Sequence, residues 1–159
     1  MNDAILEKLN SQFSESILSS STFRDDLTLV VKKEDIVRIC IYLKEDPDLS
    51  FDMLIDLCGV DMYRPEERFE IVYNVYSLKN KKYLRLKVTT DDGEKVPTVS
   101  GVWSAANWHE RETFDMYGIV FEGHPDLRRM YMPEDYEYYP LRKDYPLMGV
   151  PDAIPLPRK

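Results

Sequence analysis

The chain has 159 residues, of which 43% are hydrophobic, 12% aromatic and 31% charged. A chain of this length buries about 68–70% of the surface that it exposes when unfolded, which supports one domain with a core and excludes disorder over most of the chain. Its 21 Lys and Arg against 29 Asp and Glu give a net charge of −8. This charge argues against a nucleic-acid binder or a basic membrane-surface protein, since both need clustered cations.

The two cysteines and the start of the chain indicate a soluble, cytosolic protein. Cys40 and Cys58 each lie in an apolar run, so we predict two buried core thiols. An iron–sulfur cluster normally takes four cysteines, so this chain does not hold one alone. The first residues lack the basic region and cleavage site of a signal peptide, and no run approaches the roughly 18 apolar residues of a membrane span.

The first third of the chain predicts two helices around a strand. Apolar residues recur at helical spacing between residues 5 and 13, which indicates a short amphipathic helix. Leu27, Leu29 and Val31 alternate with Thr28, Val30 and Lys32, which predicts a strand. A second helical stripe covers 36–43, and the Asp-Pro-Asp sequence at 46–48 ends it because proline disfavours helical geometry in the residue before it.

Three strands are predicted next, at 51–60, 69–78 and 83–89, and the short polar stretch between the last two indicates an antiparallel hairpin. In the first of these strands we place Phe51, Met53, Ile55 and Leu57 on one face. In the last, Leu84, Leu86 and Val88 alternate with polar residues, which is typical of a sheet with one buried and one wet face. We therefore predict an α+β fold, a mostly antiparallel sheet with helices packed on one face.

A third helix is predicted at 102–117, with Gly118 as its C-terminal stop, and the composition changes after residue 123. Residues 124–159 hold seven of the ten prolines, five of the eleven tyrosines and equal numbers of acidic and basic residues. We predict a folded domain over 1–123 and an extended Pro/Tyr-rich arm over 124–159 that docks on partner subunits. The alternative, an arm that folds back on its own domain, stays open.

Few residues suggest catalysis or metal binding. The His-Glu-Arg-Glu sequence at 109–112 lacks the second histidine of a zinc-binding H-E-x-x-H helix. The chain has no Gly-rich phosphate loop and no G-x-S-x-G sequence. We therefore predict no catalytic, cofactor-binding or metal-binding residues. A remote alternative is a small stand-alone hydrolase that uses Glu110 and Glu112, with His109 or His124.

Four sequence stretches resemble one known family. They are Glu-Arg-Glu-Thr-Phe-Asp-Met-Tyr-Gly-Ile at 110–119, Phe-Glu-Gly-His-Pro-Asp-Leu-Arg-Arg at 121–129, Met-Pro-Glu-Asp at 132–135 and Pro-Leu-Arg-Lys-Asp-Tyr-Pro-Leu at 140–147. In this order they resemble the thirty-kilodalton subunit family of respiratory complex I, whose bacterial members are the C subunits of NADH-quinone oxidoreductase. The resemblance implies a non-catalytic structural and assembly subunit in the peripheral arm of this proton-pumping NADH:quinone oxidoreductase.

The resemblance also implies partners and a location. The chain is expected to pack beside the forty-nine-kilodalton (D) subunit and neighbouring subunits of the hydrophilic arm, at the cytoplasmic face of a bacterial membrane. FMN, iron–sulfur clusters and quinone are expected in other subunits. Interface and local structural roles fall on Trp108, Glu110, Arg111, Glu112, Asp115, His124, Pro125, Asp126, Arg128, Arg129, Pro140, Leu141, Arg142, Lys143, Asp144 and Tyr145. An equivalent subunit of a membrane-bound hydrogenase, or of a dehydrogenase with another electron donor, is the alternative.

Overall fold

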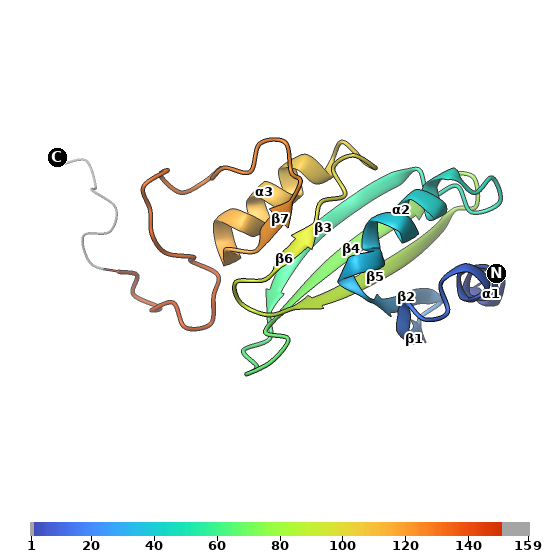
Figure 1. Ribbon diagram of the computed structural model, residues 1–159, viewed down its shortest axis with the longest axis horizontal. Coiled ribbons are helices and arrows are strands. Elements are labelled where there is room, and N and C mark those ends of the chain that lie inside the picture. The colour runs from blue at the N-terminus through green and yellow to red at the C-terminus, as the bar shows by residue number, and fades with distance from the viewer. Residues whose placement is uncertain (1, 151–159) are drawn as a thin grey trace.

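The computed structural model describes residues 2–150, which form a five-stranded sheet, a two-stranded sheet and three α-helices (Figure 1). In chain order the elements are α1 (Asn2–Phe13), β1 (Ile17–Phe23), β2 (Asp26–Val31), the 3-10 helix η1 (Lys33–Asp35), α2 (Ile36–Glu45), β3 (Met53–Asp61), β4 (Phe69–Ser77), β5 (Lys82–Thr90), β6 (Lys95–Pro97), α3 (Ala106–Tyr117) and β7 (Val120–Glu122). Within residues 2–150, no helix has the length and apolar composition that crossing a membrane requires.

The larger sheet is mostly antiparallel. Its strand order is β1-β2-β5-β4-β3, and only the β2–β5 pair within it runs parallel. The predicted hairpin between β4 and β5 is confirmed, with Phe69 opposite Thr90 and Ser77 opposite Lys82. The short strands β6 and β7 pair in parallel as a separate sheet. The predicted fold class is therefore confirmed, although the parallel pair was not part of the prediction.

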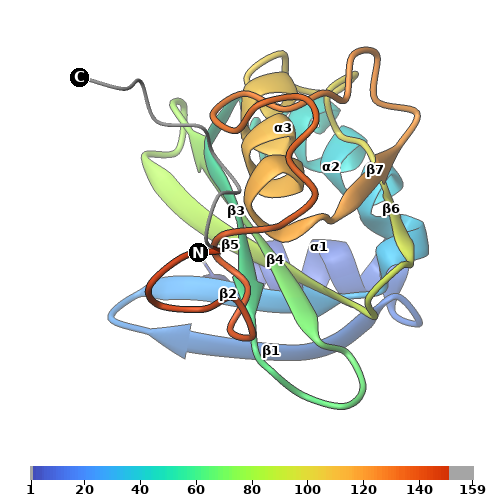
Figure 2. The ribbon, with the colours of Figure 1, turned by 90° about the vertical axis from the view of Figure 1, so that its left-hand side faces the viewer.

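One face of the larger sheet carries the core. Leu84, Leu86 and Val88 of β5 are buried on this face, as their alternation predicts. Leu9 of α1 and Ile39 of α2 belong to the same hydrophobic cluster. Figure 2 shows α2 and α3 on one side of the sheet, so helices cover one face as predicted. Burying an apolar face in this way is the main source of stability for a two-layer α+β domain.

The facing of β3 differs from the prediction. Met53 and Ile55 are 41% and 42% exposed, whereas Leu57 is buried with Leu54. The register with β4 shifts between Leu54 and Asp56, so two consecutive residues point outward there. Such a bulge inserts one extra residue and reverses the facing that strict alternation predicts. The placement of Phe51, Met53, Ile55 and Leu57 on one face is therefore wrong.

The two cysteines also differ from each other. Cys40 on α2 is buried, as predicted, and burial raises the pKa of its thiol. Cys58 on β3 is exposed, so its prediction as a core thiol is wrong. The bulge explains this difference, because it directs Leu57 inward and the next residue outward. Both cysteines are free thiols.

Some elements carry no clear sequence pattern. β1 is a serine-rich edge strand with exposed side chains along nearly all of its length, so it shows no alternation. β6 and β7 have three residues each. α3 begins at Ala106 and not at residue 102, because residues 99–105 form turns in which Val99 O accepts from Trp103 N at 3.1 Å.

Candidate functional site

Helix α3 presents the charged residues of 110–115 on two sides. Glu110, Arg111 and Asp115 are buried, whereas Glu112 is exposed. The helix ends at Gly118, whose φ of 76° is left-handed, so the predicted stop is confirmed. In Figure 1 the chain beyond β7 runs along α3, and two of the buried charges of this helix, Arg111 and Asp115, make their contacts with that segment.

The carboxylate of Asp115 binds three consecutive backbone amides of the arm. Its Oδ2 accepts from the N–H groups of Met130, Tyr131 and Met132 at 2.9, 2.6 and 3.0 Å. Its Oδ1 accepts from Nη1 of Arg129 at 2.8 Å. Burial alone would raise the pKa of Asp115, but the Tyr131 amide, Arg129 and the other two amides outweigh it and lower this pKa. Asp115 is therefore ionised, and its carboxylate holds the backbone of the arm in place.

Two arginines complete this anchor. The side chain of Arg129 is 8% exposed, and its Nη2 donates to the carbonyl of Tyr138 at 3.2 Å. Arg111 donates from Nε to the carbonyl of Arg128 at 3.2 Å and from Nη2 to that of Arg129 at 3.3 Å. The buried guanidinium groups thus donate hydrogen bonds to backbone carbonyls of an irregular segment, which lacks the regular backbone hydrogen bonds of a helix or a sheet. We call Arg111, Asp115 and Arg129 the arm anchor.

Glu110 holds the loop that precedes α3. Its Oε1 accepts from the amide of Val99 at 2.7 Å, and its Oε2 accepts from the hydroxyl of Thr98. Nε2 of His124 lies 3.9 Å from Oε2, and both side chains are fully buried. Burial raises the pKa of Glu110 to about 7, because the hydrogen bonds from Thr98 and Val99 only partly offset the loss of solvent.

His124, the first residue of the arm, connects the arm to α3. Its Nδ1 accepts from the amide of Asp126 at 3.0 Å, so the ring proton lies on Nε2 and points to the carbonyl of Asn107 at 3.0 Å. Since the imidazole bonds on both sides, it fixes the direction in which the chain leaves β7.

A second set of charges, Asp61, Arg68, Asp92, Arg142 and Asp144, joins the far part of the arm to the sheet; we call it the charged clasp. Arg68 Nη2 lies 2.8 Å from Asp61 Oδ2 and 3.0 Å from Asp144 Oδ2. Arg142 binds Asp92 in bidentate fashion, at 2.8 and 2.9 Å. Bidentate guanidinium–carboxylate pairs fix geometry as well as charge.

The clasp is reinforced by backbone bonds and an aromatic ring. Arg142 Nε donates to the carbonyl of Tyr117 at 2.6 Å, and its guanidinium lies 4.7 Å from the ring centre of Tyr139. The amide of Lys143 donates to Asp61 Oδ2 at 2.8 Å. Burial would raise the pKa of Asp61, but the bonds from Arg68 and the Lys143 amide lower it to about 2.

Gly118 is predicted to be intolerant of a side chain because the arm lies directly on it. A Cβ there would lie 2.6 Å from the Tyr139 ring and 2.8 Å from Arg142 Nη2. Gly93 has a similar φ of 84° but nothing within 4 Å, so Gly93→Ala reports the backbone cost alone, about 1–2 kcal/mol. Gly118→Ala should cost a further 1–3 kcal/mol, roughly, in urea unfolding. Equal losses for the two variants would show that the arm does not press on Gly118.

Comparison with known proteins identifies the family. The family model described as "Respiratory-chain NADH dehydrogenase, 30 Kd subunit" matches residues 29–151. The chain belongs to this family. The matched segment runs from β2 through the core sheet and α3 to the arm, so it includes both the arm anchor and the charged clasp of this respiratory-chain subunit.

Curated relatives of the respiratory-chain subunit agree with this assignment. The C subunit of NADH-quinone oxidoreductase from Geotalea uraniireducens (strain Rf4) is 48% identical over 155 residues, which cover 97% of this chain and 93% of that protein. The C 2 subunit of the same enzyme from Rhizobium meliloti (strain 1021) is 58% identical over 124 residues, which cover 78% of this chain and 68% of the relative. The expected family is therefore confirmed.

A solved structure shares the fold. One chain in the membrane-bound sulfane sulfur reductase, an archaeal respiratory membrane complex, superposes with a TM-score of 0.76 at 24% identity. The match covers 92% of this chain and 86% of that one. At this identity the likeness shows the fold alone.

Residues 124–144 of the respiratory-chain subunit lie against their own domain, through the arm anchor and the charged clasp. The division at residue 123 and the docking of the arm on partner subunits stay predictions. The interface role of the residues that carry the resemblance also stays a prediction, since several of them bond within their own chain. Glu110, Arg111, Asp115, His124, Arg129, Arg142 and Asp144 all do so.

Other residues of the same prediction lie at the surface. Among the described residues, the side chain of Arg128 bonds only Asp126, at 3.0 Å. Pro125, Leu141 and Lys143 are exposed and Pro140 is half-buried. Trp108 is 59% exposed, with the Arg111 guanidinium 4.8 Å from its ring centre. The hydroxyl of Tyr145 meets that of Tyr136 at 2.5 Å, and Tyr136 is buried.

The hydrolase alternative finds no support in this geometry. Glu110 is fully buried against Thr98 and Val99, whereas Glu112 is exposed, so the two carboxylates do not face one cleft. Within residues 2–150, no group of three or more His, Cys, Asp and Glu side chains is placed to hold a metal ion.

The sequence patterns did not reveal several functional residues. Asp61, Arg68 and Asp92 belong to the charged clasp, but they precede the recognisable stretches. Arg142 lies 50 residues from Asp92, and Lys143 lies 82 residues from Asp61. Periodicity and short motifs report local structure, so no signal in the chain links such distant partners.

Proposed function

We propose that this respiratory-chain subunit is a structural and assembly subunit of the peripheral arm of a proton-pumping NADH:quinone oxidoreductase, and that it packs beside the D subunit. The observation that carries the proposal is the arm anchor. Its three side chains form hydrogen bonds with the backbone of residues 128–138. Such bonds hold a segment in place, whereas a catalytic side chain would be directed toward a substrate.

The anchored arm presents a surface suited to a protein partner. Tyr131, Tyr138 and Leu141 are 60%, 42% and 51% exposed, although the backbone behind them is fixed. Aromatic side chains are enriched in interfaces because they contribute a large contact area at low entropy cost. A segment held in place before docking also loses less conformational freedom when it binds. We propose that this surface, with Trp108, contacts the D subunit and neighbouring hydrophilic subunits.

We further propose that the chain itself carries no redox centre and no catalytic residue. Flavin, iron–sulfur clusters and quinone then belong to other subunits. The chain has only two cysteines, and they lie on α2 and β3, with one buried and the other exposed. We place the protein on the cytoplasmic side of a bacterial membrane, attached through its partners.

The proposal is tested by purifying the tagged chain from its host under native conditions. We expect it to co-purify with the D subunit in an assembly that oxidises NADH and reduces quinone. Arg142→Ala removes the clasp to Asp92 and should lower the yield of assembled complex several-fold. Arg38→Ala removes a 71% exposed side chain and serves as the control.

Two results would contradict the proposal. A stoichiometric flavin or iron–sulfur chromophore on the isolated chain would show that it carries a redox centre. Co-purification with hydrogenase subunits, in an assembly that NADH does not reduce, would favour the equivalent subunit of a related complex.

A further inference from the structure

The face of the larger sheet that points away from the helices carries an apolar row across several strands. Met53 of β3 lies opposite Tyr76 of β4, and Tyr76 lies opposite Tyr83 of β5. The two tyrosine rings are 4.6 Å apart. Met53 and Tyr83 are 41% and 52% exposed, and Ile55, directed outward by the bulge, is 42% exposed. We call Met53, Ile55, Tyr76 and Tyr83 the outer apolar row.

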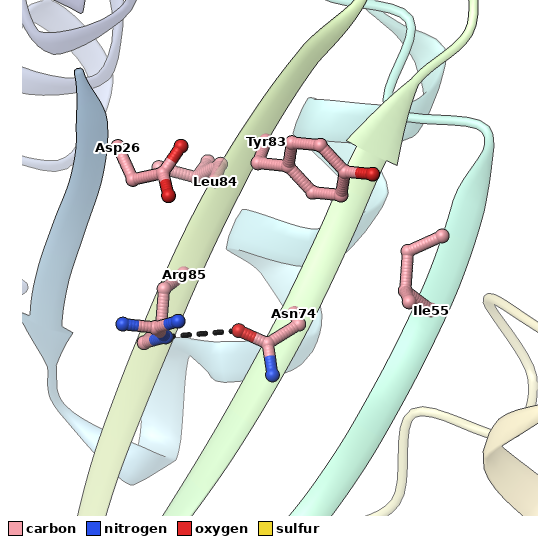
Figure 3. A pocket seen from close by; sticks show the side chains of 6 residues that line it. All are labelled: Asp26, Ile55, Asn74, Tyr83, Leu84 and Arg85. Atoms are coloured by element: carbon pink, nitrogen blue, oxygen red, sulfur yellow. Dashed lines mark hydrogen bonds between the residues drawn. The ribbon is translucent and has the colours of Figure 1, made fainter. Parts of the chain in front are cut away.

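A cation without a carboxylate partner lies beside this row. Arg85 is two residues after Tyr83 on β5, and its Nε donates to Oδ1 of Asn74 at 2.9 Å (Figure 3). Among residues 2–150 no carboxylate forms an ion pair with its guanidinium. Lys87, the next outward residue of the same strand, pairs with Glu70 at 2.8 Å. The guanidinium therefore retains free donors at the surface.

Two residues of the row, Ile55 and Tyr83, line a shallow hollow of about 280 Å³ together with Leu84, Asn74 and Arg85. Figure 3 shows Ile55 and Tyr83 on one part of its wall and Arg85 with Asn74 on another. Asp26 of β2 lines the hollow on the same side as Arg85, opposite Ile55, and forms no ion pair in the described chain. An apolar floor with one available guanidinium is the pattern of an interface hot spot, since Tyr and Arg contribute most to binding when a partner excludes water from them.

We propose that this hollow is a second docking surface, for a partner protein segment that presents one carboxylate flanked by apolar side chains. The carboxylate binds the free donors of Arg85 in the fork geometry that a guanidinium offers, and the apolar side chains cover Ile55 and Tyr83. Asp26 repels a second acidic group, which restricts the partner to a single carboxylate directed at Arg85. The surface lies on the sheet, apart from the arm anchor on α3.

The inference rests on the proposed function only in that the partner is sought in the assembled complex. The test replaces Tyr83 with the photo-crosslinking residue p-benzoyl-phenylalanine in the full chain, expressed in its host. The native complex is irradiated and the adduct is mapped by mass spectrometry. We expect an adduct with another subunit, at a peptide that has Asp or Glu between apolar residues.

Charge variants in the same background decide the role of Arg85. Arg85→Glu should lower the adduct yield about tenfold, because it places like charges opposite each other. Arg64→Glu makes the same charge change at an exposed loop position and should leave the yield unchanged. Circular dichroism and thermal melting of Arg85→Glu verify that the fold is retained.

Several outcomes would overturn the inference. They are no adduct, an adduct with a second copy of this chain, an adduct peptide without a carboxylate, and an unchanged yield for Arg85→Glu. Complex membership is measured separately on the unmodified chain. A chain that co-purifies with the D subunit but gives no adduct therefore overturns this inference and leaves the proposed function intact.

Discussion

Replacing Asp115 with alanine is expected to lower the free energy of unfolding by about 3–5 kcal/mol, the range for breaking a buried ion pair by removing one partner. The variant leaves the buried guanidinium of Arg129 without its carboxylate and the amides of Met130, Tyr131 and Met132 without their acceptor. For a chain of this size the loss corresponds to a decrease in Tm on the order of 10 °C.

Two variants on the same helix test the origin of this loss. Asp115→Asn keeps an oxygen for the three amides but gives up the charge that binds Arg129, so its loss should be smaller. Glu112→Ala removes an exposed carboxylate three residues earlier and should change stability by less than about 0.5 kcal/mol. Urea unfolding measures all three variants. If Asp115→Ala matched Glu112→Ala, the arm anchor would contribute nothing to stability.

Hydrogen exchange measures the same change locally. In the isolated wild-type chain we expect the amides of Met130, Tyr131 and Met132 to be protected, because each donates to Asp115. In Asp115→Ala these three amides should exchange faster, while those of β4 and β5 keep their protection. Unprotected amides in the wild-type chain would indicate that the arm becomes ordered only when it docks on a partner subunit, and not by folding back on its own domain.

Local sequence patterns predicted the parts of the fold that depend on residues close together in the chain. The alternation in β5 identifies a strand with one buried face, and Gly118 marks a helix end that needs a left-handed residue. The bulge at Ile55 follows from pairing with β4, which is not visible in the chain, so strict alternation assigned the wrong face. The edge strand β1 buries almost nothing and therefore has no pattern to detect.

For the candidate site, the resemblance marked Asp115, Arg129 and Arg142 but not what they contact. Charged side chains among tyrosines and prolines fit an interface with another chain as well as contacts within one chain. The structure shows contacts within the chain, because Arg129 of the arm binds Asp115 of α3 and both side chains are almost completely buried. The decisive partners are backbone amides and carbonyls. Every residue type has these groups, so such contacts cannot be inferred from the sequence.

Glu110 makes the stability of the protein depend on pH with the opposite sign to that of most carboxylates. Burial raises the pKa of the folded state to about 7 from an ordinary value of 4.5. The contribution of Glu110 is therefore fully present below pH 4.5 and is lost as the pH rises through 7. The loss is about 3 kcal/mol in total, and it leaves a buried carboxylate with only the Thr98 and Val99 hydrogen bonds and His124 nearby.

Asp61 acts in a different pH range, so the two effects can be separated. Its pKa is about 2 in the folded state, below its ordinary value of 3.8, so its contribution is present above pH 4 and is lost as the pH falls toward 2. Between pH 5 and 8 the contribution of Asp61 is constant. A stability change in that interval therefore does not come from Asp61.

Glu110→Gln isolates this effect, because glutamine is neutral at every pH and keeps an oxygen to accept from the Val99 amide. Between pH 5 and 8 the free energy of unfolding of the wild-type chain should fall by about 2–3 kcal/mol relative to Glu110→Gln, measured by urea denaturation at each pH. Glu112→Gln removes an exposed carboxylate of the same helix and is the matched control, with the wild-type slope. Parallel curves for wild type and Glu110→Gln would mean that Glu110 is charged in the folded state at neutral pH and that its hydrogen bonds fully offset its burial.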